Sequence, residues 1–109
     1  MKTVITSEGS DKNSIFDLRF GRAVFFCVYD DATGGMEFIK NEYADAQGGV
    51  GTSASKKMLE LGVQKVISGD FGPKAIDILE RFKVQLVIMP DDNNKIVDIV
   101  DMLKAGVKR

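Results

Sequence analysis

The sequence predicts a single three-layer α/β domain built around a mixed five-stranded sheet. Three observations predict this class. Residues 1–40 contain β-branched and aromatic runs separated by turns, the remainder alternates helical stripes with short apolar strands, and 109 residues suffice for one ordinary domain. The expected element order is therefore β-β-β-α-β-α-β-α, with all residues from 1 to 109 in one domain.

The first half of the chain supplies three strands. Residues 2–6 form a β-branched run that ends in turn-forming residues. Residues 23–30 are apolar on both alternating faces, which is typical of a central strand covered on both sides. A turn at Gly34 and Gly35 leads into residues 36–40, whose partial alternation favours an edge strand. The second and third strands are thus expected to be antiparallel neighbours.

The second half supplies three helices and two strands. One apolar stripe runs from Val50 to Leu61 and is followed by a glycine, which is typical of a helix end. The next helix opens near Pro73, and the last stripe runs from Ile96 to Val107 after the capping-prone Asp92, Asn93 and Asn94. The two strands between these helices are expected at residues 63–67 and 84–89.

This order restricts the topology of the sheet. Strand–helix–strand units are parallel and right-handed, which predicts the strand order 3-2-1-4-5 with the second strand reversed. This is the ribonuclease H-like arrangement, with helices on both faces. A flavodoxin-like sheet is the main alternative, but it needs a helix between the first two strands, where residues 14–18 are too short for one.

Composition excludes several classes of protein. Fifteen basic and sixteen acidic side chains give a net charge of -1, which removes the bulk attraction that non-specific nucleic-acid binding needs. With Cys27 as its one cysteine and no histidine, the chain lacks the usual zinc and four-thiolate ligand sets. The start is unlike a signal peptide and no long apolar run follows. We therefore expect a cytoplasmic protein without a membrane segment.

Four loops are expected to meet at the edge of the sheet where the parallel strands end. They span residues 19–22, 47–53, 68–73 and 90–94. Glycines let backbone amides approach a ligand, and helix starts leave amides unpaired, so this edge favours an anion. Arg19 and Arg22 would contribute cationic forks. A purely structural interpretation, with glycines in turns and arginines on the surface, fits the sequence equally well.

Two other groups of residues favour structural roles. Asp70, Asp91 and Asp92 could together attract a cation, but acidic residues ahead of helices are more often caps and dipole partners. Cys27 lies in the most apolar strand, where a thiol packs as a small hydrophobic group. We therefore expect no metal site and no catalytic residue from these positions.

Three motifs stand in a characteristic order and spacing. They are Arg19-Phe20-Gly21-Arg22-Ala23, Gly48-Gly49-Val50-Gly51 and Gly69-Asp70-Phe71-Gly72-Pro73-Lys74-Ala75. Through them the chain resembles the dinitrogenase iron-molybdenum cofactor biosynthesis family, of the NifX and NifB C-terminal type, over nearly its whole length. The resemblance implies the ribonuclease H-like fold. Better-understood relatives bind the nitrogenase cofactor or its iron-sulfur precursor, whereas many small single-domain relatives have no assigned role.

The resemblance also implies a set of ligand contacts. By matching motif they are Arg19, Phe20, Arg22, Gly49, Gly51, Thr52, Gly72 and Pro73. Relatives often carry a histidine just ahead of the glycine loop, where this chain has Gln47. The implied function is a non-enzymatic carrier or chaperone that captures an iron-sulfur or iron-molybdenum type cluster, with cofactor-assembly proteins as partners.

Two further functions stay open on the sequence alone. One is a small enzyme or sensor acting on a phosphorylated or carboxylated metabolite, with Asp70 as acid or base. The other is a regulatory or scaffolding module whose partner docks along the third strand, at the edge of the sheet.

Overall fold

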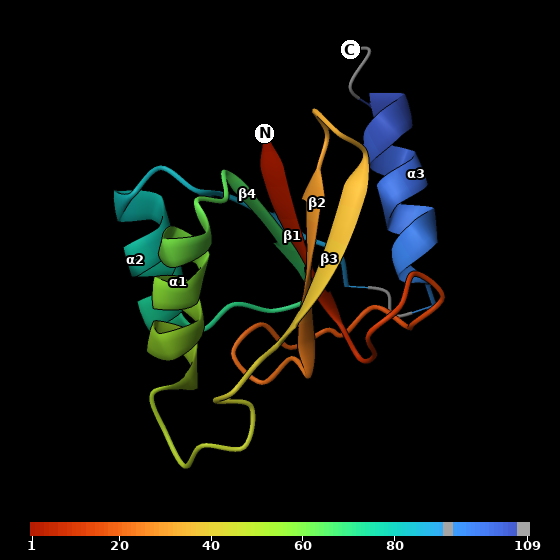
Figure 1. Cartoon of the computed structure of the whole chain (residues 1–109). Coiled ribbons are helices and arrows are strands. Elements are labelled where there is room, and N and C mark those ends of the chain that lie inside the picture. The colour runs from red at the N-terminus through yellow and green to blue at the C-terminus, as the bar shows by residue number, and fades with distance from the viewer. Residues whose placement is uncertain (91–92, 107–109) are drawn as a thin grey trace.

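The chain forms a five-stranded sheet with two helices on one face and one on the other (Figure 1). The computed structural model describes residues 1–90 and 93–106. In chain order the elements are β1 Lys2–Ser7, β2 Phe25–Asp30, β3 Gly35–Lys40, α1 Val50–Leu61, β4 Lys65–Ser68, α2 Pro73–Arg81, β5 Gln85–Ile88 and α3 Ile96–Gly106. This order confirms the predicted succession of strands and helices.

The strand order is β3-β2-β1-β4-β5, as predicted. β2 is antiparallel to both of its neighbours, whereas β1, β4 and β5 run parallel. One row of the register joins Phe38, Cys27, Ile5 and Ile67 across four strands. Members of one row point to the same face of a sheet, so the register aligns a continuous apolar layer.

Each face of the sheet has its own hydrophobic core. The face under α1 and α2 buries, among others, Val4, Phe26, Met58, Val66 and Leu79. The face under α3 buries Ile5, Phe16, Cys27, Ile67, Ile96 and Val100. Burying such side chains contributes about 1.5–3 kcal/mol each, which makes the two layers the main stabilising feature. Among the described helices, none has the length and apolar character needed to span a membrane.

Two predicted strands start two residues later than expected, and β5 starts one residue later. Val63 donates its N–H to the carbonyl of Met58 at 3.3 Å and so belongs to the C-terminal cap of α1, which delays β4 until Lys65. β2 likewise begins at Phe25, because Val24 donates its N–H to a side chain of the preceding loop. The predicted helical position Val107 and the capping residue Asp92 lie outside the described residues.

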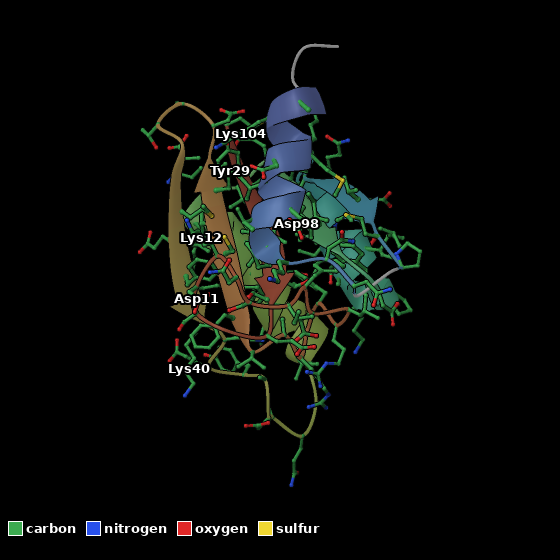
Figure 2. The ribbon with its side chains drawn as sticks, turned by 90° about the vertical axis from the view of Figure 1, so that its right-hand side faces the viewer. Asp11, Lys12, Tyr29, Lys40, Asp98 and Lys104 are labelled. Atoms are coloured by element: carbon green, nitrogen blue, oxygen red, sulfur yellow. The ribbon has the colours of Figure 1, made fainter. Side chains whose placement is uncertain are left out.

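The loop after β1 caps the start of α3. Ile96 donates its N–H to the Ser14 carbonyl at 2.9 Å, and Val97 donates to the Lys12 carbonyl at 2.8 Å. Asp98 supplies a carboxylate in the first turn of the helix. Figure 2 shows Lys12 and Asp98 close to this end of α3. The first amides of α3 therefore already have partners inside the chain.

Cys27 lies in the middle of β2 and is fully buried, which confirms that it packs as a small hydrophobic residue. Burial raises the pKa of its thiol from 9.0 to about 12. At pH 8 the folded protein should therefore react with iodoacetamide roughly a thousandfold more slowly than the unfolded chain, because the thiolate is the nucleophile.

The raised pKa of Cys27 also predicts how the stability of the protein changes with pH, and unfolding experiments can check this. The unfolded thiol loses its proton near pH 9.0 while the folded thiol keeps it to about pH 12, so stability should fall between these values and be unaffected below them. Urea unfolding of wild type and Cys27→Ala at pH 8 and pH 10.5 measures this. An equal fall in the alanine variant would show that other groups cause it.

Candidate functional site

α1 and α2 lie side by side and begin at the same edge of the sheet (Figure 1). Their first turns touch, because a Cβ placed on Gly51 would lie 3.6 Å from the Cβ of Ala75. Between these turns lies a hollow of about 350 Å³, which we call the glycine hollow. It is lined by Gly49, Val50, Gly51, Thr52, Gly72, Pro73, Lys74 and Ala75.

Neither helix start at the glycine hollow is capped by a side chain, and neither first turn has an acidic residue. α1 follows Gly49, whose φ of 69° lies in the left-handed region that favours glycine. The first bonded amides are those of Ser53 and Ile76, which donate to the Gly49 and Gly72 carbonyls. Among the described residues, the N–H groups without a hydrogen-bond partner at these starts are those of Val50, Gly51, Thr52, Lys74 and Ala75.

These free amides give the glycine hollow its electrostatic character. The two helix starts line one space, and the free N–H groups and partial positive charge of helix starts attract an anion. Lys74 can add an ammonium group and Thr52 a hydroxyl. The rest of the wall is aliphatic, from Val50, Pro73 and Ala75. The capped start of α3 shows that open helix starts are not a general property of this fold.

The loop between β1 and β2 packs against the start of α1. A Cβ on Gly21 would lie 2.9 Å from Val50 Cγ2 and 3.0 Å from the backbone nitrogen of Gly51. Such distances are shorter than ordinary contacts, so only glycine lets the two backbones approach this closely. Gly21 is therefore part of the support of the glycine hollow.

Gly21→Ala should lower the free energy of unfolding by about 1–3 kcal/mol, because the start of α1 must shift to admit the methyl group. Gly48→Ala is the matched control, since a Cβ there meets nothing within 4 Å. Urea unfolding measures both variants. Equal stabilities would mean that the contact at Gly21 relaxes freely.

Arg19 is held by a buried carboxylate. Its Nε and Nη2 donate to the two oxygens of Asp17 at 3.1 and 3.2 Å. Asp17 is 1% exposed and also accepts the N–H groups of Arg19, at 3.0 Å, and Val24, at 3.3 Å. The hydrogen bond and the charge of Asp17 raise the pKa of Arg19. From the sequence alone, Asp17 was not singled out. The signal was an acidic residue between two apolar ones, Phe16 and Leu18, which is a pattern that can place a carboxylate in the interior.

Arg22 is also engaged with the protein. Its Nη1 donates to the carbonyls of Ala44 and Ala46, both at 3.0 Å. The two arginines line a second hollow of about 320 Å³, the arginine hollow, whose lining also includes Lys40, Glu42 and Asp45. No lining residue is common to the two hollows. The guanidinium groups therefore lie outside the glycine hollow, contrary to the expected single cationic site.

The structure thus divides the eight predicted contact residues into three groups. Gly49, Gly51, Thr52, Gly72 and Pro73 line the glycine hollow, and Arg19 and Arg22 line the arginine hollow. Phe20 is 2% exposed and packs with Phe26 and Phe71 at ring distances of 6.2 and 5.0 Å. Its ring is therefore part of the core. Ligand contact by these residues stays a prediction.

The expected meeting of loops does occur near Asp70. The Asp70 carbonyl accepts the N–H of Phe20 at 3.3 Å. Arg19 and Asp70 also form an isolated parallel β-bridge. The Asp70 side chain is exposed, while Asp91 and Asp92 lie outside the described residues. Within residues 1–90 and 93–106, no three histidine, cysteine, aspartate or glutamate side chains form a group able to hold a metal ion.

The chain is similar in structure to several known proteins. The apo form of the orange protein from Desulfovibrio gigas matches with a TM-score of 0.88 and 26% identity, over 96% of this chain and 88% of that chain. The NMR structure of a Thermotoga protein provisionally named NifB matches with a TM-score of 0.81 and 28% identity, over the same shares of the two chains, 96% and 88%. A third chain, at 17% identity and a TM-score of 0.79, shares the fold.

Sequence comparison assigns the family. No match is found among curated protein sequences. The model of the family described as dinitrogenase iron-molybdenum cofactor matches residues 1–106, nearly the whole chain. Its span includes every residue of both hollows. The chain therefore belongs to the dinitrogenase iron-molybdenum cofactor family.

Proposed function

We propose that this protein is a carrier that binds an anionic metal–sulfur cofactor, of the iron-molybdenum or iron-sulfur type, in the glycine hollow. The observation that carries the proposal is the convergence of two uncapped helix starts on one hollow. Family membership supplies the class of cargo. Cofactor-assembly proteins are the partners that such a carrier would serve.

The chemistry of the hollow suits such a cargo. Sulfide and oxo groups at the surface of a cluster accept hydrogen bonds, and the free amides of Val50, Gly51 and Thr52 can donate them. Lys74 offsets negative charge, and aliphatic walls pack against sulfur. A cluster held by hydrogen bonds and charge leaves without breaking a bond between metal and protein. This mode of binding therefore favours transfer over permanent retention.

The names of two similar proteins agree with this class of function. The orange protein structure is an apo form, which is a form without its bound group. The Thermotoga protein is provisionally named after NifB. Both cover nearly all of this chain, so the helix starts that line the glycine hollow fall within the shared fold.

Anaerobic loading tests the proposal. Protein incubated with ferrous iron, sulfide and molybdate, then separated from small molecules by gel filtration, should retain metal and visible absorption at about one cluster per chain. Phosphate should lower retention by competing for the same amides. Protein that elutes without metal after loading, while remaining folded, would contradict the proposed function.

A metabolite-binding enzyme or sensor is the second candidate. It is favoured by the Thr52 hydroxyl and the Lys74 ammonium beside free amides, a set of groups that also binds phosphate. Inorganic phosphate would then shift the amide resonances of Gly49, Gly51 and Thr52 at millimolar concentration. That shift in a protein that retains no cluster would favour this candidate over the carrier.

A further inference from the structure

The segment between β3 and α1 has few anchors of its own. We call residues 42–49 the strap; it is the long loop below α1 in Figure 1. None of its residues is buried, so apolar packing contributes little to its position. Its internal hydrogen bonds are local, such as the N–H of Ala46 to the carbonyl of Tyr43 at 3.0 Å. Something outside the strap must therefore determine its path.

Both ends of the strap are fixed. At one end Asn41 is 5% exposed, and its side-chain amide donates to the carbonyls of Gly21 and Ala23 at 3.0 and 2.9 Å. At the other end Gly49 accepts the N–H of Ser53 and starts α1. The strap between these anchors leads directly into the free amides of the glycine hollow.

Arg22 supplies the attachment in the middle. Asn41, at the start of the strap, accepts the N–H groups of Tyr43 and Ala44 at 3.1 and 3.3 Å. Beyond this neighbouring anchor, the hydrogen bonds in the described part of the chain that join the interior of the strap to another loop are those from Arg22 to Ala44 and Ala46. Both bonds come from Nη1, so one nitrogen holds two carbonyls at once. A hydrogen bond from a charged donor is among the stronger ones, which suits a single point of attachment.

We propose that Arg22 is a positioning residue for the glycine hollow: its guanidinium holds the strap and so sets where Gly49 and the first amides of α1 lie. That the glycine hollow binds a cargo rests on the proposed function. The hydrogen bonds from Arg22 to the strap are present without any ligand. In this role Arg22 acts through backbone carbonyls and needs no contact with the cargo. The neighbouring residue Gly21 packs against Val50, so the backbone at Arg22 lies beside the start of α1.

Three variants separate attachment from charge. Arg22→Met keeps the aliphatic stem and removes the charge and the donors. Arg22→Lys keeps the charge and N–H donors, but on a side chain one bond shorter and without the planar fork. Arg81→Met is the matched control, because Arg81 is an exposed arginine paired with Asp77 on α2. In ligand-free protein, the amides of Ala44 and Ala46 should exchange with deuterium roughly tenfold faster in both Arg22 variants, and unchanged in Arg81→Met.

The amide resonances of Gly49 and Gly51 should also shift in both Arg22 variants, although neither residue contacts Arg22. Unchanged exchange and unchanged resonances in Arg22→Met would overturn the proposal, whatever the cargo. Loading with iron, sulfide and molybdate should be weakened equally in Arg22→Lys and Arg22→Met. Full loading of Arg22→Lys despite faster exchange at Ala44 and Ala46, beside weak loading of Arg22→Met, would assign Arg22 a role through charge and also overturn the proposal. Failure of the wild type to load contradicts the proposed function alone, because exchange still decides the attachment.

Discussion

Asp17→Ala is expected to lower the free energy of unfolding by about 2–5 kcal/mol, as measured by urea titration. The substitution removes a carboxylate that is 1% exposed and that accepts four hydrogen bonds. It leaves the amide of Val24 and the guanidinium of Arg19 without this partner. The loop between β1 and β2, which packs against the start of α1, should loosen as a consequence.

The exposed pair of Asp77 and Arg81 provides the control. Its atoms approach to 2.7 Å, closer than those of Asp17 and Arg19, but both side chains are about two-thirds exposed, at 67% and 64%. Asp77→Ala should therefore cost less than about 0.5 kcal/mol. If Asp17→Ala fails to fold, Asp17→Asn keeps one oxygen for Val24 and should show an intermediate loss. Equal effects at positions 17 and 77 would mean that burial of the carboxylate is unimportant.

Thr52→Glu is expected to weaken cluster loading by roughly a hundredfold, because a second negative charge would lie within a few ångströms of the cargo. The fold should be unaffected or slightly stabilised. Thr52 is the third residue of α1, where a carboxylate interacts favourably with the helix start, typically by 0.3–1 kcal/mol. Loss of binding could then not be explained by unfolding.

Thr52→Gln separates charge from size. Glutamine fills nearly the same volume as glutamate without its charge, so this variant should retain most of the loading capacity. Metal content after anaerobic gel filtration and thermal unfolding are measured for both variants. Loading that survives Thr52→Glu would place the cargo outside the glycine hollow, and equal loss in both variants would indicate a steric effect.

The fold was predictable because its determinants are periodic. The stripe from Val50 to Leu61 and the alternation of the short strands are read directly along the chain. The handedness of strand–helix–strand units then leaves few ways to order five strands. The boundaries of the elements were less predictable. Val63 is a residue type that favours strands, but its N–H donates to the Met58 carbonyl in the C-terminal cap of α1.

The candidate site was predictable only in part. Gly49, Gly51 and Gly72 converge as expected, because they begin helices that follow parallel strands and therefore share an edge. Phe20 lies beside two arginines in the sequence, but its ring belongs to the core. A motif preserves the order of residues and does not state which side chains face a ligand.

The amino-acid sequence was enough to predict the order of strands and helices, the strand order of the sheet and the position of the glycine-lined helix starts. Each of these follows from local periodicity and from the handedness of strand–helix–strand connections. Only the tertiary structure decided which polar groups remain free. From the sequence, Arg22 is expected to be a charged residue on the surface. In the structure its Nη1 donates to the carbonyls of Ala44 and Ala46, which are 22 and 24 residues away. Hydrogen-bond partners so distant leave no pattern in a sequence, because they depend on how separate loops approach one another in space.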